Sequence, residues 1–336
     1  MKILNNKNLK IFNIDPHKLR GNNFYRSIVT YREEIYKKLS KFILKDTKSL
    51  SCRLCKSRKK KKILSWKKKY QLFKCLNCEL IYPNINISDK DYFLNKVYEN
   101  KSYTKKFKRE ITSNFDYRKN NFGQERFNYT VKRLNINKKS NILDLGCGAG
   151  YYLKILKEKK YKYKGLEVAN HLVRYCNEEH GLNVKNTALE YEKNNSYKLI
   201  TMFDVIEHLY DPIQTFLELN KKLKNNGYCV AYTPNFHSIG YEIMREKQNT
   251  LLPFEHLCFF NDKSLNILSK KTGFKVEKIE TFGFDIMDYL MMKEYEDQIN
   301  FTKKLKEMIS ICQSAIDKLG LSNHFRITFK KIKPIE

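Results

Sequence analysis

The chain has 336 residues, of which 41% are hydrophobic and 13% aromatic, with 12 Gly and 6 Pro. This composition is typical of an ordered globular protein with a main domain and smaller accessory parts, and it excludes a disordered or fibrous chain. The formal net charge of +30 suits a polyanionic partner such as RNA, a nucleotide-linked substrate or an anionic membrane surface. Because the basic residues are spread along the chain, compositional bias is a competing explanation.

The sequence also bears on the cellular compartment. It contains no apolar run long enough to cross a bilayer, and its start, MKILNNKNLK, has no apolar signal core. We therefore expect a cytoplasmic protein. Nine cysteines in that compartment are expected to be thiols or metal ligands, because the cytosol keeps thiols reduced.

The N-terminal third is predicted to contain three parts. Residues 1–50 form a helical segment, in which apolar side chains between residues 25 and 43 follow a helical period. Residues 51–83 form a zinc-ribbon-like module, whose sequences ILSW and YQLFK are expected to pair as two short strands. Residues 84–122 are a polar connector, or cap, with short helices.

Two CxxC pairs carry the zinc prediction. They are separated by 19 residues and match the spacing of a four-thiolate site; the ligands are Cys52, Cys55, Cys75 and Cys78. Because the protein fills all four positions, this Zn²⁺ is expected to stabilise the fold and not to catalyse. Lys56 and Glu79 stand after each second Cys, where such turns commonly have Gly.

From residue 123 to 336 strand and helix signals alternate, which predicts an α/β domain with a parallel sheet and helices on both faces. A helix is expected to begin at Asp211 and Pro212 and to stop at Gly227. Another runs from about Ser264 to Lys271, and a further helix near 305–319 precedes a last strand near 325–329. The other expected strands are NILDL, YKGLEV, LNVKN, YKLITMF, GYCVAYT and FKVEKIETF.

A glycine turn follows the first of these strands. Asp144 is followed by Gly146, Gly148 and Gly150, so bare backbone can approach a ligand at the start of the next helix. The fingerprint of a dinucleotide-binding turn would have its third Gly at the position of Tyr151. This difference argues against a nicotinamide dinucleotide as the cofactor. Glu167 ends the second strand, where a carboxylate can accept hydrogen bonds from ribose hydroxyls, so the pair of features predicts a nucleoside cofactor.

Five segments in this order resemble the motifs of class I S-adenosylmethionine-dependent methyltransferases: ILDLGCGAG, GLEV, ITMFDVIEHLYDP, NNGYCVAYTPN and PFEHLCFFNDKSLNILSKKTGF. The resemblance covers residues 123–332 and is greatest to the group that includes ubiquinone-pathway O-methyltransferases and methyltransferases of surface-sugar biosynthesis. It implies a Rossmann-like, mostly parallel sheet of seven strands with the last strand antiparallel. It also implies S-adenosylmethionine as the cofactor.

The same resemblance assigns cofactor contacts. Asp144, Gly146 and Gly148 would hold the methionine moiety, with Gly150 completing the turn, and Glu167 would hold the ribose. Thr187, Ala188 and Leu189 would contact the adenine edge. Phe203 and Asp204 would lie beside the sulfonium end.

Two Glu-His pairs could serve the chemistry, since a hydroxyl or carbon acid must lose a proton before it accepts a methyl group. We expect His256, assisted by Glu255, to be the base. This pair lies in an insertion at about 235–260 that is predicted to cap the substrate. The sugar C-methyltransferases that the zinc module and this domain together resemble use a matching pair. A His that only anchors the loop is the alternative. The other pair belongs to Asp204, Glu207 and His208, a cluster that resembles a Mg²⁺ site of the ubiquinone-pathway enzymes. A Glu and a His that cap the following turn without a metal are the alternative.

The sequence is compatible with three functions. The first is a methyltransferase for a small or carrier-linked metabolite, with a nucleotide- or lipid-linked sugar hydroxyl or carbon in surface-polysaccharide synthesis as the acceptor. The second is an RNA methyltransferase, although the sequence has no aromatic and basic platform for single-stranded nucleic acid. The third is a non-catalytic scaffold that binds S-adenosylmethionine.

Overall fold

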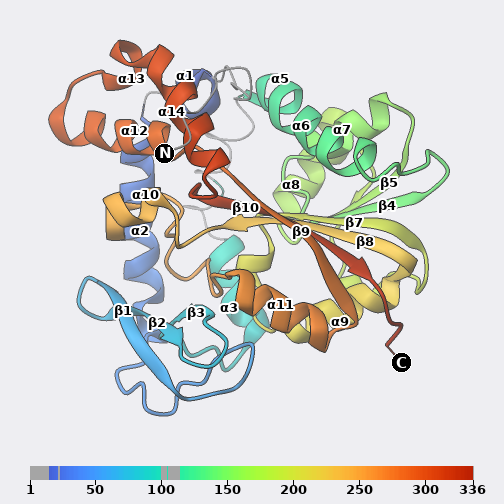
Figure 1. Cartoon of the computed structure of the whole chain (residues 1–336), viewed down its shortest axis with the longest axis horizontal. Helices are drawn as coiled ribbons and strands as arrows, with labels where there is room; N and C mark the ends of the chain where they lie inside the picture. Colours follow the sequence, from blue (N-terminus) through green and yellow to red (C-terminus); the bar gives the residue numbers. More distant parts are fainter. Residues whose placement is uncertain (1–14, 22, 100–103, 105–113, 336) are drawn as a thin grey trace.

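The computed structural model describes residues 15–21, 23–99, 104 and 114–335, and all structural statements below concern these residues. They form a seven-stranded sheet surrounded by helices and a separate three-stranded sheet near the N-terminal end (Figure 1).

The large sheet has the strand order β6-β5-β4-β7-β8-β10-β9, and β10 runs antiparallel to its neighbours β8 and β9. The four other pairings are parallel. This arrangement confirms the predicted Rossmann-like sheet of seven strands with an antiparallel last strand. The strands are β4 (Asn141–Leu145), β5 (Lys162–Leu166), β6 (Val184–Lys185), β7 (Tyr197–Phe203), β8 (Leu223–Pro234), β9 (Phe274–Phe282) and β10 (His324–Lys331).

Helices cover both faces of this sheet (Figure 1). On one side a nearly continuous helix runs through α5 (Phe115–Arg118), α6 (Gln124–Phe127) and two π-helical turns, and packs on α7 (Tyr151–Glu158). The other side carries α9 (Pro212–Lys222) and α11 (Asp262–Lys271). The remaining helices are α1 (Pro16–Arg20), α2 (Phe24–Leu39), α3 (Lys90–Tyr98), α8 (Asn170–Arg174), α10 (Ile239–Met244), α12 (Asp285–Asp297), α13 (Phe301–Lys304) and α14 (Lys306–Lys318).

Helix α9 shows where the sequence prediction holds and where it is wrong. Asp211 caps the helix by accepting a hydrogen bond from the Gln214 amide at 3.0 Å, and Pro212 occupies the first turn, as predicted. The predicted stop at Gly227 is wrong, because the helix ends at Lys222. Leu223 is fully buried and already pairs with Tyr197 of β7, so strand pairing ends the helix and Gly227 lies within β8.

The small sheet has the order β1-β2-β3, with β1 (Lys60–Trp66) and β2 (Tyr70–Cys75) forming the predicted hairpin. A third strand, β3 (Ile81–Pro83), was not predicted. Ile81 pairs with Phe259 of the segment before α11, through amide to carbonyl distances of 3.0 and 2.8 Å. The small sheet, α2 and one face of the large sheet share one buried core. The predicted domain boundaries at residues 50, 83 and 122 therefore stay a prediction.

Among the described helices, none combines the length and apolar character needed to cross a membrane. The amphipathic helix expected at 25–43 is α2 followed by a short 3-10 turn, and its buried residues include Ile28 and Ile35.

Candidate functional site

The glycine turn connects β4 to α7 at the carboxyl edge of the sheet. Gly146, Gly148 and Gly150 all have positive φ angles, of 69°, 56° and 79°. A Cβ atom at Gly146 would lie 2.5 Å from Cγ2 of Val205, and one at Gly150 would lie 2.5 Å from Cδ1 of Leu182. All three positions therefore favour Gly for the backbone conformation, and Gly146 and Gly150 also favour it for the close approach.

Asp144 lies on β4 beneath this turn. Its Oδ1 accepts a hydrogen bond from the Thr201 hydroxyl at 2.7 Å, and the side chain is almost fully buried. Burial raises the pKa of Asp144 to about 7, although the hydrogen bond from Thr201 opposes this shift. The carboxyl group is therefore poised to ionise when a cation arrives beside it.

Glu167 fixes the turn to the end of β5. Its Oε2 accepts a hydrogen bond from the Gly148 amide at 2.9 Å, and its Oε1 accepts one from the Ala169 amide at 3.0 Å. Burial raises the pKa of this carboxyl, against the effect of the two amides. Each oxygen keeps a second lone pair, which is the geometry needed to accept ribose hydroxyls. Its contact with ribose stays a prediction.

The other predicted cofactor residues have different surroundings. Leu189 is buried, Thr187 is half-buried and Ala188 is exposed, along the loop that leaves β6. Phe203 is part of the core on one face of the sheet, packed edge-to-face on Tyr152 and Tyr232 at centroid distances of 5.2 and 4.8 Å.

Asp204 follows Phe203 in a left-handed conformation, with φ of 59°. Its carboxylate accepts a hydrogen bond from Arg126 at 3.3 Å and lies 3.6 Å from Nε2 of His324. These partners hold the side chain at the edge of the sheet, where 45% of it is exposed.

The two predicted Glu-His pairs converge on one group. The Nε2 atoms of His208 and His256 lie 3.9 and 4.0 Å from Oε1 of Glu207, and the two imidazole rings meet edge-to-face with centroids 4.7 Å apart. Glu207 is fully buried, its Oε2 accepts a hydrogen bond from the Thr233 hydroxyl at 2.9 Å, and burial raises its pKa well above the usual range. Glu255 is also buried, and it is close enough for its charge to raise the pKa of Glu207 further.

Backbone contacts explain the convergence. The carbonyl oxygen of Glu207 accepts hydrogen bonds from the amides of Leu257 and Cys258, at 2.7 and 3.0 Å. The segment after β8 is thereby tied to the segment after β7, which brings His256 beside Glu207 although 49 positions separate them in the sequence.

Tyr98 is a site residue that the sequence reasoning missed. It ends α3 and its hydroxyl lies 2.8 Å from Nδ1 of His208. Burial, and then the negative charges of Glu255, Glu167 and Glu207, raise the pKa of Tyr98 well above its usual value. Tyr98 therefore stands near both the predicted ribose carboxylate and the histidine group. No motif marks it, and only the abundance of Tyr in the predicted connector could have directed attention to it.

The geometry also bears on the predicted Mg²⁺ cluster. Ligand atoms of Glu207, His208 and His256 lie within 4.8 Å of one another and could hold a metal ion. Asp204, which the prediction included, is not in this group, and its carboxylate pairs with Arg126 instead. One carboxylate and two imidazoles suit a transition metal better than Mg²⁺, which prefers oxygen ligands.

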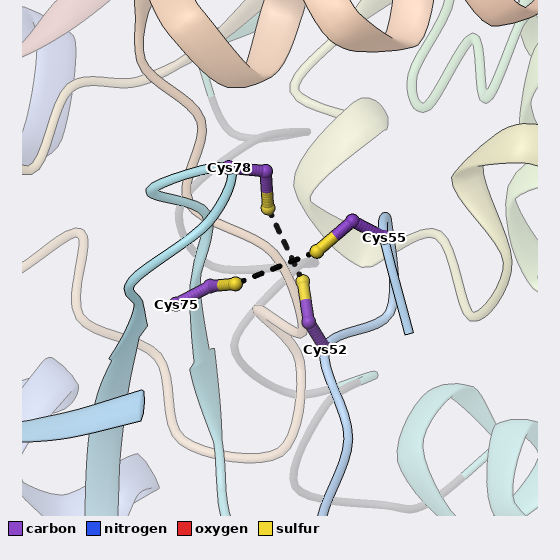
Figure 2. A group of neighbouring side chains, drawn as sticks. All are labelled: Cys52, Cys55, Cys75 and Cys78. Atoms are coloured by element: carbon purple, nitrogen blue, oxygen red, sulfur yellow. Dashed lines mark hydrogen bonds between the residues drawn. The ribbon is translucent and has the colours of Figure 1, made fainter. Parts of the chain in front are cut away.

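The four cysteines of the module point toward a common centre (Figure 2). The Sγ atoms of Cys52 and Cys78 are 3.3 Å apart, those of Cys55 and Cys75 are 3.5 Å apart, and all four lie within 4.8 Å of one another. Zinc with bonds of about 2.3 Å to each sulfur would fit between them with small adjustments.

The turn residues of the module are the ones that the sequence marked as unusual. Lys56 and Glu79 have φ angles of 60° and 64°, in the left-handed region where Gly is common. Their amides donate to the carbonyls of Cys52 and Cys75 at 2.9 and 3.0 Å. Both turns therefore have the expected shape without glycine.

The chain also matches known proteins. A family model described as a methyltransferase domain matches residues 117–279. A ubiquinone biosynthesis O-methyltransferase of Nitrosospira multiformis is 21% identical over 48% of this chain and 73% of that protein. One from Saccharophagus degradans is 28% identical over 34% of this chain and 52% of that protein, about half its length.

Among solved structures, a SAM dependent methyltransferase from Archaeoglobus fulgidus is 19% identical, covers 72% of this chain and 100% of that one, and has a TM-score of 0.44. The assignment rests on the family match, the curated relatives and the observed sheet. The fold and the glycine turn define a Rossmann-like protein of the methyltransferase type. The chain is a class I S-adenosylmethionine-dependent methyltransferase, and therefore an enzyme.

Proposed function

We propose that the enzyme methylates a hydroxyl group or an acidic carbon of a small or carrier-linked acceptor, with a nucleotide- or lipid-linked sugar as the first candidate. The observation that carries this proposal is the buried group of Glu207, His208 and His256, with Tyr98 beside it, near the cofactor turn. A sugar hydroxyl or carbon acid needs a base, whereas methyl transfer to a neutral amine makes a smaller demand.

S-adenosylmethionine would supply the methyl group, held by the backbone of the glycine turn with Asp144 near its positive charges and Glu167 at its ribose. The Gly positions fit this cofactor, because their positive φ angles shape a turn whose backbone carries no side chains and can approach a ligand closely. The enzyme then mainly has to align the acceptor and exclude water, since the sulfonium already activates the methyl carbon.

His256 would take the acceptor proton. The positive charge that forms on its ring lies about 4.0 Å from Glu207 Oε1, and the negative partial charge of this oxygen stabilises the imidazolium. Tyr98 would orient His208 through the 2.8 Å contact with Nδ1. In this scheme Glu255 is a neighbour that adds negative charge at the site.

We also propose that Cys52, Cys55, Cys75 and Cys78 hold a structural Zn²⁺. The convergence of four sulfur atoms and the paired turns support this assignment. Because β3 pairs with Phe259, the metal would also stabilise the segment that carries His256.

The proposed base can be tested by replacing His256 with Ala. Wild-type enzyme, labelled S-adenosylmethionine and a panel of sugar nucleotides should give a methylated product, and His256→Ala should lose this turnover while binding the cofactor with unchanged affinity. His237→Ala is the matched control, since this His belongs to the same insertion but lies near Lys74 and Glu79 of the small sheet. Full turnover by His256→Ala would exclude it as the base.

A second candidate is O-methylation of a catechol-like phenol assisted by a divalent ion. The two curated relatives are ubiquinone biosynthesis O-methyltransferases, which favours O-methylation, and Glu207, His208 and His256 could hold the ion. A panel of catechols, assayed with and without a chelator, separates the two functions. Turnover restricted to catechols and lost with the chelator would favour the second function over the first.

A further inference from the structure

The hairpin of the small sheet carries an unusual concentration of positive charge. Between Thr47 and Cys78 the sequence has 12 Lys or Arg and no Asp or Glu. Four thiolates around a Zn²⁺ would carry a net charge of −2, which leaves the segment strongly positive. The overall charge of the chain is therefore not evenly distributed.

Six of these cations make up what we call the basic face, a name that covers both sides of the hairpin because neighbouring residues such as Lys61 and Lys62 point to opposite sides of a strand. All are exposed on or beside the β1-β2 hairpin, and none forms an ion pair within the part of the chain that the structure describes; they are Arg58, Lys59, Lys61, Lys62, Lys68 and Lys69. Strand β1 is an edge strand of the small sheet, and the hairpin stands at the periphery of the molecule (Figure 1). These six exposed side chains are thus open to an anionic partner.

The tip of the hairpin has lysines at positions where the backbone conformation favours other residues. Lys67 and Lys68 have φ angles of 49° and 60°, a conformation for which hairpin turns strongly prefer Asn and Gly. Lysine at both positions is unfavourable for the turn, and three adjacent lysines also repel one another. Glu33 compensates Lys67 through an ion pair, while Lys68 and Lys69 remain exposed.

The apolar side chains on this surface distinguish between anionic partners. Ile63 and Leu76 are 37% and 57% exposed, and the Leu76 amide donates to the carbonyl of Lys59 at 3.0 Å, so an aliphatic side chain lies next to the cations. The aromatic residues of the module are turned inward: Tyr70 and Phe73 are buried, and Trp66 packs against Tyr36. Aliphatic groups among lysines suit the interface of a bilayer, whereas single-stranded RNA is bound by stacking on exposed aromatic rings.

We propose that the basic face docks the enzyme on a membrane surface that contains anionic phospholipid. Lys61, Lys62, Lys68 and Lys69 supply the attraction to lipid phosphates, and Ile63 and Leu76 enter the boundary between headgroups and acyl chains. This docking is peripheral and does not depend on the identity of the methyl acceptor.

Vesicle sedimentation tests the proposal with the full chain. Wild-type protein should bind phosphatidylcholine vesicles that contain about one third phosphatidylglycerol, should bind pure phosphatidylcholine only weakly, and should be released by salt. Replacing Lys61, Lys62, Lys68 and Lys69 together with Gln should weaken binding by roughly a hundredfold or more, since each lysine near the surface contributes about fivefold. Replacing Ile63 and Leu76 with Gln should weaken the binding that persists at high salt.

The control removes the same charge elsewhere. Lys139, Lys193, Lys270 and Lys271 are exposed and lie outside the module, so the fourfold Gln variant at these positions should bind vesicles nearly as well as wild type. Equal melting temperatures and zinc contents show that both variants are folded. Equal loss in both variants, or no binding of wild type to the anionic vesicles, overturns the proposal. A basic-face variant that loses RNA binding but keeps vesicle binding overturns it in favour of a nucleic-acid surface.

Discussion

Substitution of Gly146 by Ala tests the glycine turn most sharply. Its φ angle of 69° is unfavourable for Ala, and the new Cβ would lie 2.5 Å from Cγ2 of Val205. The left-handed backbone costs about 1–2 kcal/mol, and overpacking adds about 1–3 kcal/mol. At roughly 2 °C per kcal/mol for a chain of this size, the melting temperature should fall by about 4–10 °C. Displacement of the turn should also weaken S-adenosylhomocysteine binding at least about tenfold, as measured by titration calorimetry.

Gly320 provides the matched control. It has a φ angle of 76°, but a Cβ atom there would meet nothing within 4 Å. Gly320→Ala should therefore show only the backbone effect, a fall of about 2–4 °C, with unchanged cofactor affinity. If the two variants lose equal stability and equal affinity, the close approach at Gly146 has no role in binding and the reasoning is refuted.

Three further predictions concern the cofactor carboxylates and the zinc module. Burial raises the pKa of Asp144 to about 7, so ionisation of this carboxyl lowers the stability of the ligand-free protein as pH rises from about 4 to 7. Cationic S-adenosylmethionine favours the ionised carboxylate, so the affinity for S-adenosylmethionine should rise about tenfold between about pH 6 and pH 8. Asp144→Asn should remove this pH dependence. Glu167→Gln places an amide donor against the Gly148 or Ala169 amide and should weaken S-adenosylhomocysteine binding about 10- to 100-fold, whereas the exposed Glu178→Gln should not; equal affinities would contradict the ribose assignment. Cys78→Ser should release the zinc measured by elemental analysis and lower turnover more than cofactor affinity, because β3 holds Phe259 near His256; a folded wild type without zinc would contradict the module.

Local signals were sufficient for most of the fold. NILDL, YKLITMF and FKVEKIETF are the strands β4, β7 and β9 with the predicted ends, because each is a short apolar or alternating run bounded by turn residues. The cap at Asp211 is likewise encoded by adjacent residues. The stop at Gly227 was misplaced because the competing interaction, pairing of Leu223 with Tyr197, is distant in sequence. Helix α12 (Asp285–Asp297) was not predicted at all.

The site shows the same limit. Residues of the turn and Glu167 could be proposed because they lie one strand and one helix apart in a known motif order. The grouping of Glu207, His208 and His256 could not be predicted from the sequence. It depends on hydrogen bonds from the amides of Leu257 and Cys258 to the Glu207 carbonyl. Tyr98 reaches the same group from α3, which no spacing rule connects to the sheet.

The most direct test of the account is calorimetric titration of the purified wild-type enzyme with S-adenosylhomocysteine, with NADH as the comparison ligand. The turn from Asp144 to Gly150 together with Glu167 predicts one site per chain for S-adenosylhomocysteine, a rise in melting temperature on binding, and neither effect with NADH. Binding of NADH in place of S-adenosylhomocysteine, or binding of neither, would contradict the account.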